Sequence, residues 1–338
     1  MRAATFEAIG KPLAIETVSD PTPGEGELVL RVRGCGICGS DLHVSELPGA
    51  LARGTVMGHE FAGEVAAVGR GVGGFREGDR VCALPAIGCG RCAACLTGDV
   101  MGCPRLRATG FGEIGGGYAE YVVVGEHETL RLPERVAPAD GALVEPLAVG
   151  LHAVDEAKLR TGEDVLVVGA GPVGLAVAMW AKQLGAREVV VSDFVASRRE
   201  MAARMGATTL VDPAEEDVRE AFERAAGHAP TTIFECVGVP GLLQQCIGLA
   251  PRRARIVVAG VCMQPDTIVP VAASVKALCL QFVSYYRRGD FALTLDMLGA
   301  GRIDPFPMVT DRIGLDALPE AFEALRTPQH QCKVIVEP

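Results

Sequence analysis

Hydrophobic and polar positions alternate over much of the first 145 residues. In the segment 27–33, Leu28, Leu30 and Val32 fall on one face and polar residues on the other, which is typical of a half-buried β-strand. Further short strands are expected at 61–69, 79–84 and 118–124, because Gly- and Pro-rich turns bound these runs. This part of the chain is therefore expected to form a partly open β-barrel.

The pattern changes near residue 141. From there to residue 157, Leu143, Leu147 and Leu151 recur at helical spacing. Apolar runs then alternate with helical stretches, which indicates an α/β domain with a doubly wound parallel sheet covered on both faces. Six strands are expected, at 165–168, 188–191, 209–211, 232–234, 255–258 and 278–285.

The tail, from about residue 290, is expected to hold one helical stretch and a final strand at 333–336, and to return to the first domain. Residues 1–146 and 290–338 are thus assigned to the β-rich domain and residues 147–289 to the α/β domain. A chain of 338 residues with 49% hydrophobic composition can bury two such cores.

Charge and composition narrow the function classes. The net charge of −10 leaves no basic footprint, so neither nucleic acid nor a membrane surface is expected as a partner. The first ten residues hold Arg2 and Glu7 and no long apolar core, so no signal peptide is predicted. We expect a soluble, cytoplasmic protein.

A glycine-rich turn follows the strand predicted at 165–168. In Gly169-Ala-Gly171-Pro-Val-Gly174, the three glycines permit the tight turn, the approach of a pyrophosphate and close packing of helix on strand. The following helix presents free N–H groups to the phosphates. The residues expected to bind a dinucleotide here are Gly169, Gly171, Pro172, Val173 and Gly174.

The next predicted strand ends at Asp193, 19 residues after Gly174. This is the place of the acidic residue that binds ribose hydroxyls, and its charge disfavours a 2′-phosphate. NAD is therefore expected as the cofactor rather than NADP. Arg198 and Arg199 follow closely; they could contact the cofactor, accept a phosphate, or lie on a solvated helix face.

The β-rich part carries residues of the types that bind catalytic zinc. Cys38, Ser40, Asp41 and His43 lie in one short segment, His59 and Glu60 follow, and Glu145 precedes Pro146 at the domain junction. Thiolate, imidazole and carboxylate are the ligands of zinc that keeps one position open. Taken singly, a cysteine or histidine is more often structural, but a carboxylate at the start of an apolar strand is costly to bury unpaired.

Four of the twelve cysteines cluster with the spacing C-x2-C-x2-C-x7-C, at Cys89, Cys92, Cys95 and Cys103. A closed four-thiolate structural zinc site is the preferred interpretation. An iron–sulfur cluster, disulfides and free thiols remain alternatives. Burial is expected for Cys35, Cys82, Cys236, Cys246, Cys262, Cys279 and Cys332.

The order and spacing of these motifs resemble the zinc-containing medium-chain dehydrogenase/reductase (alcohol dehydrogenase) family over essentially the whole chain. The element Glu145-Pro146-Leu147 is similar to the sorbitol and threonine dehydrogenase branch. The resemblance implies a Rossmann domain, a GroES-like catalytic domain and two zinc ions per subunit, one catalytic and one structural.

The resemblance also implies roles for individual residues. Cys38 and His59 would bind the catalytic zinc. Glu60 would be a third ligand or one that exchanges with water, and Glu145 would bind directly or through that water. Asp41 would orient His59, Ser40 would accept the alcohol proton, and His43 would carry it to solvent.

The function expected from these features is hydride transfer between NAD and a secondary alcohol or its ketone. Polyols and L-threonine are alternative substrates, and a non-catalytic or redox-sensing protein of the same fold is the alternative of another class. The segment 44–58 is mostly apolar and holds no aromatic residue, which favours medium-sized or cyclic secondary alcohols. A homotetramer, or at least a dimer, is expected from the resemblance.

Overall fold

The computed structural model describes residues 1–338 and divides into two compact units. The β-rich unit comprises Met1–Glu145, Tyr286–Arg302 and Val309–Pro338. The α/β unit comprises Pro146–Tyr285 and Ile303–Met308. The short segment Ile303–Met308 belongs to the α/β unit because its turn, η3 (Phe306–Met308), packs against helix α5 (Ala196–Arg204).

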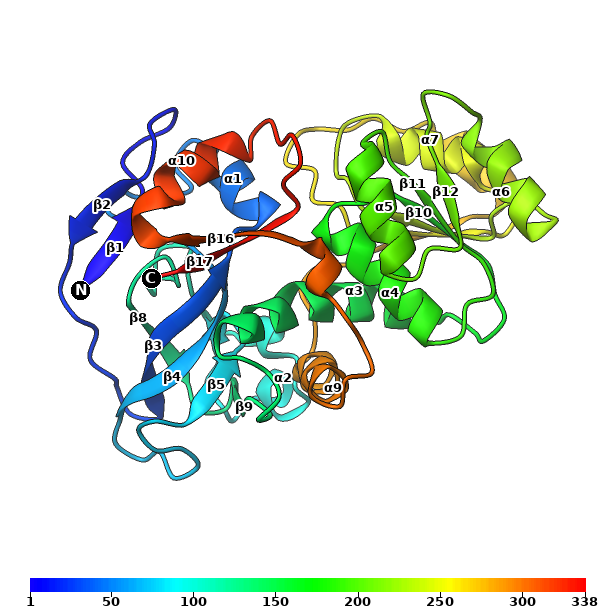
Figure 1. The fold of residues 1–338 in the computed structure, drawn as a ribbon. Coiled ribbons are helices and arrows are strands. Elements are labelled where there is room, and N and C mark those ends of the chain that lie inside the picture. Colours follow the sequence, from blue (N-terminus) through cyan, green and yellow to red (C-terminus); the bar gives the residue numbers. More distant parts are fainter. The chain divides into compact units, whose positions relative to one another are not determined.

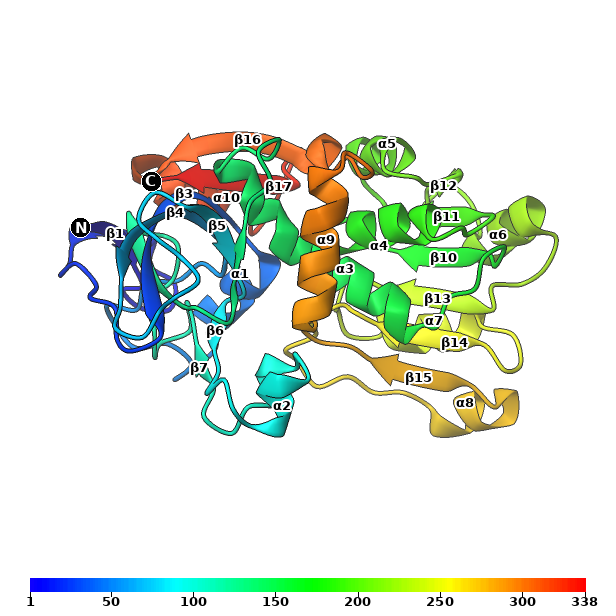
Figure 2. The ribbon, with the colours of Figure 1, turned by 90° about the horizontal axis from the view of Figure 1, so that it is seen from below.

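Six parallel strands form the sheet of the α/β unit, in the order β12-β11-β10-β13-β14-β15, which Figure 2 shows. The strand order reverses between β10 and β13, and in sheets of this kind the ligand crevice opens at that point. The six strands predicted from the apolar runs are confirmed. Their bounds are β10 Val165–Val168, β11 Val189–Ser192, β12 Thr209–Val211, β13 Thr232–Glu235, β14 Arg255–Val258 and β15 Cys279–Phe282.

Helices cover both faces of this sheet, as the continuous apolar strands predict. Val165, Leu166 and Val167 point alternately to the two faces and are all fully buried. Helix α3 (Val144–Glu156) is joined to α4 (Pro172–Gln183) by a buried hydrogen bond from Trp180 Nε1 to the Leu147 carbonyl, 2.8 Å long. The remaining helices are α6 Val218–Ala226, α7 Leu242–Leu249 and α8 Pro270–Lys276.

The β-rich unit is built on a seven-stranded sheet in the order β16-β17-β3-β4-β5-β9, with β8 also paired to β3 (Figure 1). Strand β3 is the long central strand, and its antiparallel ladder with β4 contains two bulges. Smaller two-stranded sheets flank it. The strand bounds are β1 Arg2–Thr5, β2 Ala14–Thr17, β3 Glu27–Gly36, β4 Glu60–Val68, β5 Arg80–Ala83, β6 Ala86–Ile87, β7 Arg107–Ala108, β8 Tyr121–Gly125, β9 Thr129–Arg131, β16 Val309–Gly314 and β17 Lys333–Glu337.

The two predicted architectures, a doubly wound parallel sheet and a β-rich domain, are therefore both present. The helices of the β-rich unit are short except for α9. Their bounds are α1 Gly39–Ser45, α2 Ala93–Leu96, α9 Arg288–Gly299 and α10 Leu318–Ala324, with 3-10 turns η1 Val100–Gly102, η2 Ala139–Leu143 and η4 Leu315–Ala317.

The tail contains more structure than the sequence predicts. One helical stretch was expected after residue 290, whereas α9 begins at Arg288 and a second helix, α10, follows. Strand β16 was also missed. Its residues are half-buried or exposed and include Asp311 and Arg312, so they carry no apolar alternation. The final strand, β17, returns to the middle of the β-rich sheet and pairs with β3.

The expectation that seven cysteines are buried is correct for four of them, Cys35, Cys82, Cys246 and Cys332. Cys236 and Cys262 are half-buried, and Cys279 is exposed. Cys279 opens β15, the edge strand of the parallel sheet, so one side of this apolar strand has no neighbour to cover it. No helix of the chain is long and apolar enough to cross a bilayer.

Candidate functional site

Three side chains of the types that bind metal ions meet where β3 ends and β4 begins. Cys38 precedes helix α1, and His59 and Glu60 stand at the start of β4. The thiol sulfur, an imidazole nitrogen and a carboxylate oxygen all lie within 4.8 Å of one another. The structure thus brings together three of the four residues predicted to bind the catalytic metal.

Glycines make this convergence possible. Gly36 is paired with Glu60 across the β3–β4 ladder, and a Cβ at Gly36 would overlap the Glu60 carboxylate. Gly58 has φ +91°, and a Cβ there would overlap the ring of Tyr118. The turn before His59 therefore requires glycine for both conformation and space.

Asp41 fixes the orientation of His59. Its Oδ1 lies 3.1 Å from His59 Nδ1, and its Oδ2 accepts hydrogen bonds from Tyr118 Oη at 2.6 Å and from the Cys38 amide at 3.2 Å. Burial opposes ionisation of Asp41, but the charge of His59 and these hydrogen bonds lower the pKa of the carboxyl. The ionised carboxylate holds Nδ1 and leaves Nε2 free to bind a metal.

Ser40 lies beside the same group, whereas His43 lies at the surface. The Ser40 hydroxyl donates to Cys38 Sγ at 3.2 Å and is 3.5 Å from His59 Nε2. His43 is exposed and stands three residues further along α1, a spacing that puts two side chains on one side of a helix. The position of Ser40 suits a proton acceptor next to Cys38 and His59, and the position of His43 suits a proton carrier in contact with solvent.

Glu145, the fourth predicted ligand, is a buried residue in the first turn of α3 and stands outside the three-residue group. Burial raises the pKa of Glu145 to about 7, and the nearby charge of Glu60 adds to the increase while that of His59 opposes it. The buried Tyr286 hydroxyl lies next to Glu145 and opposes part of this increase by hydrogen bonding to the carboxylate. The net effect is that Glu145 ionises less readily than an exposed glutamate.

Glu60 is engaged by a buried cation. Lys333 Nζ lies 2.6 Å from each Glu60 carboxylate oxygen, and both side chains are 1% exposed. This ion pair joins the first residue of β17 to the first residue of β4. The carboxylate therefore has a strong partner within the protein.

The donor set fits zinc. One thiolate, one imidazole nitrogen and a carboxylate form a three-ligand set that leaves a position for a water or substrate oxygen, and Asp41 provides the carboxylate–histidine contact that commonly supports such a ligand. Cys38, His59 and either Glu60 or Glu145 are the residues that could hold the ion.

A second donor group is formed by the four clustered cysteines. The sulfurs of Cys89, Cys92, Cys95 and Cys103 lie within 4.8 Å of one another, and all twelve cysteines are free thiols. Backbone N–H groups point at them: the amides of Cys89 and Arg105 lie 3.3 and 3.4 Å from Cys103 Sγ. The Arg91 amide and the Arg105 side chain lower the pKa of Cys89 to about 5. Burial and the neighbouring Cys92 side chain raise the pKa of Cys95 to about 12, so the lowered value belongs to Cys89 alone. Four cysteine sulfurs gathered in this way fit a closed tetrahedral zinc site, in which the bound metal would keep the thiols deprotonated.

In the α/β unit, the glycine turn has the geometry that its sequence predicts. Gly169 has φ +95°, and a Cβ at Gly174 would overlap the Gly169 carbonyl. Around Gly171, in contrast, no atom lies within 4 Å of the place of a Cβ. Pro172 and Val173 open helix α4. The open space over Gly171 at the N-terminus of a 12-residue helix fits a pyrophosphate.

Asp193 follows β11 and is bound to the glycine turn itself. Its two oxygens accept hydrogen bonds from the amides of Ala170 at 2.7 Å and Val195 at 2.8 Å. Arg199 is paired with Asp212 at 2.8 Å and donates to the Asp193 carbonyl, so it has a structural role. Arg198 is half-buried on α5.

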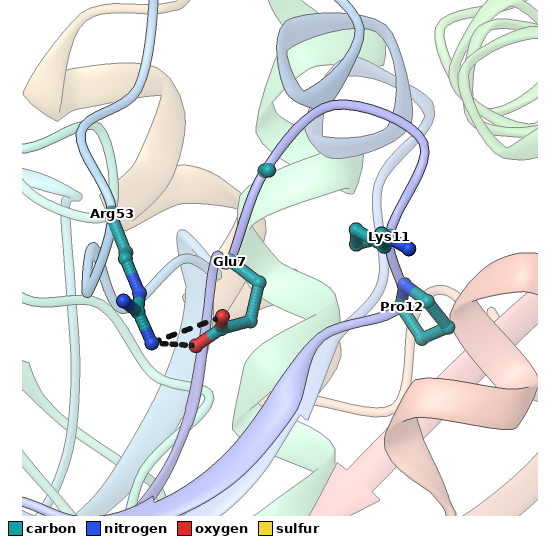
Figure 3. A pocket seen from close by; sticks show the side chains of 5 residues that line it. Glu7, Lys11, Pro12 and Arg53 are labelled. Carbon is teal, nitrogen blue, oxygen red and sulfur yellow. Dashed lines mark hydrogen bonds and ion pairs between the residues drawn. The ribbon is translucent and has the colours of Figure 1, made fainter.

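A surface pocket in the β-rich unit is separate from these residues. It is lined by Glu7, Ala8, Lys11, Pro12 and Arg53, and Figure 3 shows Arg53 directed at Glu7, to which it is paired at 3.2 Å. None of the predicted site residues lines it.

Several residues of the site were missed from the sequence, namely Lys333, Tyr118, Tyr286 and Phe111, whose ring centroid lies 5.2 Å from that of His59. Lys333 carried a signal, since a lysine opening an otherwise apolar strand needs a buried partner. The three aromatic residues carried none, because each joins the site only through tertiary contacts.

Two family models match the chain. Residues 24–134 match the alcohol dehydrogenase GroES-like domain, and residues 172–300 match the zinc-binding dehydrogenase model. Among curated proteins, the chain is 34% identical to (R,R)-butanediol dehydrogenase of Bacillus subtilis, covering 97% of both chains. It is 30% identical to sorbitol dehydrogenase of the same organism, covering 100% of this chain and 97% of the relative.

Solved structures agree over the whole length. A protein of Sinorhizobium meliloti 1021 described as a zinc-binding dehydrogenase bound to NADP has a TM-score of 0.90 and 32% identity, covering 100% of this chain and 99% of that one. An Escherichia coli CFT073 protein described as a short chain alcohol dehydrogenase complexed with NADH has a TM-score of 0.89 and 30% identity, with the same coverage.

Replacing Asp41 with Asn should weaken zinc binding at Cys38 and His59 by about 10- to 100-fold. The neutral amide would orient the His59 ring less firmly and would make its Nε2 a weaker electron donor to the metal. The measurement is a chelator-competition titration, with the Cys38→Ala chain subtracted to isolate this site. Glu64→Gln removes a carboxylate charge from an exposed pair with Arg33 and serves as the matched control. An affinity in Asp41→Asn equal to that of the control would contradict the role given to Asp41.

Proposed function

The chain belongs to the zinc-dependent alcohol dehydrogenase family, whose members are oxidoreductases that act on alcohols, and we propose that it transfers a hydride between NAD and a secondary alcohol or its ketone. The family resemblance and the two-domain architecture predicted from the motifs are confirmed. The observation that carries the proposal is the presence, in one chain, of a three-donor metal group and a dinucleotide turn.

The catalytic zinc site is proposed to consist of Cys38 and His59 with Glu60 or Glu145 as the carboxylate. When bound, zinc supplies a positive charge that lowers the pKa of an alcohol hydroxyl, and NAD supplies the acceptor for the hydride. Asp41 keeps His59 in the tautomer that presents Nε2.

Proton removal is proposed to pass through Ser40 to His43. The Ser40 hydroxyl lies within 3.5 Å of both Cys38 Sγ and His59 Nε2, so an oxygen bound in the open position would be within its reach. Ser40 can accept a proton only if it passes one on, and the exposed His43 on the same helix would release it to solvent.

The four-cysteine lobe is proposed to hold a second, structural zinc ion, which gives two per chain. Its four sulfurs close the coordination shell and leave no position for substrate. An iron–sulfur cluster or a redox switch is less favoured. The seven residues between Cys95 and Cys103 make a longer gap than the ferredoxin spacing has, and the sequence holds no second cluster of cysteines. The free thiols also favour a reducing compartment, and we propose the cytoplasm.

NAD is proposed over NADP because a carboxylate, Asp193, follows β11 where the ribose hydroxyls are expected. Arg199 is already occupied by Asp212, which leaves Arg198 as the nearby arginine that could receive a 2′-phosphate. The NADP-bound and NADH-bound structures described above show that proteins of this fold use both cofactors.

The substrate is proposed to be a medium-sized or cyclic secondary alcohol. The similarity to (R,R)-butanediol dehydrogenase supports a secondary alcohol, and the similarity to sorbitol dehydrogenase keeps polyols as the second candidate. L-Threonine is a third, since the chain is 33% identical to L-threonine 3-dehydrogenase of Pyrococcus horikoshii over 91% of its length. Phe111, close to His59, adds an apolar surface to the mostly apolar segment 44–58.

An oligomer built through the α/β unit is proposed from its uncovered edge. Strand β15 ends the sheet, so its outer N–H and C=O groups have no strand partner. Figure 2 shows helix α8 beside β15 at this end of the sheet. Phe282 on β15 is 65% exposed, and Val271 and Val275 on α8 are 63% and 64% exposed. A second copy of the chain could cover this apolar edge.

A panel of secondary alcohols, polyols and L-threonine tested with NAD should give reduced cofactor with at least one secondary alcohol. Cys38→Ser should abolish this turnover because it removes a metal ligand, while NAD binding measured by calorimetry stays largely unchanged. Cys82→Ser, at a buried cysteine outside both metal groups, is the control. Full activity in Cys38→Ser would remove Cys38 from the mechanism.

Asp193→Ala should reduce the preference for NAD over NADP, because it removes the negative charge that repels a 2′-phosphate. The measurement is the ratio of kcat/KM for the two cofactors with one alcohol. Glu200→Ala removes an exposed carboxylate from the neighbouring helix α5 and is the comparison. A ratio in Asp193→Ala equal to that of the unaltered chain would mean that the ribose is bound elsewhere.

Phe282→Glu should lower the oligomeric state by placing a charge on the uncovered edge of β15. Sedimentation equilibrium provides the measurement. Leu96→Glu makes the same type of change at an apolar side chain that is 74% exposed in the β-rich unit and should leave the mass unaltered. A Phe282→Glu protein with the mass of the unaltered oligomer would exclude this edge as the interface.

A further inference from the structure

Arg326, two residues beyond the end of helix α10, binds the last turn of helix α1, which lies beside α10 in Figure 1. Its Nη2 donates to the Ser45 hydroxyl at 3.0 Å, and its Nη1 donates to the Glu46 carboxylate at 2.6 Å and lies 3.5 Å from the Leu42 carbonyl. The buried Ser45 hydroxyl in turn donates to the Leu42 carbonyl at 2.7 Å. Three residues at the end of one helix therefore share a single guanidinium group.

The guanidinium group is itself held in place by α10. Its Nε and Nη2 donate to the two Glu323 oxygens at 2.8 and 3.3 Å, and it lies over the ring of Phe322, 5.6 Å from the ring centre. The Arg326 side chain is 24% exposed. Because all three nitrogens of this planar group have partners, Arg326 can fix the turn of α1 rather than follow its motion.

Helix α1 needs such contacts because it is short. It has seven residues, and an isolated helix of this length is not stable in water. Its first turn is fixed through Asp41, which is bound to His59 and Tyr118. Its last turn carries the exposed His43, and Arg326 supplies the ionic contact that ties this turn to α10.

Helix α10 also supports the first turn of α1, through two aromatic rings. Phe322 packs edge-on against Tyr118, with the ring centroids 6.4 Å apart and the planes at 82°. Tyr118 Oη then donates to Asp41 at 2.6 Å. Both ends of α1 are therefore placed by α10, one through these rings and the other through Arg326.

We infer that Arg326 is a positioning residue for proton transfer, which keeps His43 within reach of the proton that Ser40 passes on. This inference rests on the proposed function, in which the alcohol proton leaves through Ser40 and His43 while the hydride goes to NAD. None of the contacts of Arg326 is a metal-binding residue or part of the glycine turn. Its loss should therefore slow removal of the proton and leave binding of the cofactor intact.

The test compares Arg326→Met with the unaltered chain, both loaded with zinc, using NAD and the secondary alcohol that gives the highest turnover. The kcat/KM for the alcohol should fall by about 10- to 100-fold, because a displacement of about 1 Å at a reacting group costs up to this much. The Kd for NAD, measured by calorimetry, should stay unchanged. Added N-methylmorpholine, a tertiary amine that binds metals weakly, should accept the proton in place of His43 and restore most of the lost rate.

Arg31→Met is the matched control. Arg31 also lies 5.6 Å from the centre of an aromatic ring, that of Tyr121, but this contact joins strands β3 and β8. This variant should keep the kcat/KM of the unaltered chain and gain nothing from the amine. Arg326→Lys keeps the positive charge but not the fork of donors, so it should retain part of the rate.

Ser45→Ala gives an answer even if Arg326→Met does not fold. It removes the hydroxyl that joins Arg326 to the Leu42 carbonyl, and it should cause a smaller loss of kcat/KM that the amine also reverses. An unchanged kcat/KM in a folded Arg326→Met protein would overturn the inference, as would a loss that the amine does not reverse. If only Ser45→Ala folds, the same two outcomes in that variant decide against it.

The failure of the proposed function gives a different result. An unaltered chain that reduces NAD with no alcohol would overturn the proposed function and this inference together. Turnover by the unaltered chain, without an amine-reversible loss in Arg326→Met, would leave the proposed function standing and remove the role given to Arg326.

Discussion

The register of the β3–β4 ladder is the constraint on which the candidate active site depends. It places Gly36 opposite Glu60, and this pairing brings Cys38, two residues beyond Gly36, next to His59, one residue before Glu60. A slip of one residue would turn Glu60 to the other face of the sheet. The glycines at 36 and 58 are required because side chains there would occupy the space of Glu60 and Tyr118. The pairing of β3 with β4, rather than a flexible loop, therefore brings Cys38, His59 and Glu60 together.

Contacts from distant parts of the chain complete this group. Asp41 is held by His59 and Tyr118, and Glu60 by Lys333. Each of these carboxylates is buried, and each would be costly to bury alone. These contacts give the two acidic residues different partners: Asp41 holds the imidazole ring of His59, and Glu60 is neutralised by the ammonium group of Lys333.

The sequence was sufficient where chemistry is encoded locally. The glycine turn at 169–174, the four-cysteine spacing and the six apolar strands each lie within a short segment, and the structure places them as predicted. It was insufficient where partners are far apart: Lys333 and Glu60 are separated by 273 positions, and Tyr118 and Asp41 by 77. Strand β16 was missed because its residues show no apolar alternation, and Cys279 was wrongly expected to be buried because an edge strand cannot be told from a central one by its composition.

The central claim is that a zinc ion binds between Cys38 and His59 in addition to the one in the four-cysteine lobe. Anomalous diffraction from crystals of the zinc-loaded protein, recorded on both sides of the zinc absorption edge, tests it most directly. The account predicts two zinc peaks per chain, one of them within bonding distance of Cys38 Sγ and His59 Nε2. A single peak, confined to Cys89, Cys92, Cys95 and Cys103, would contradict it.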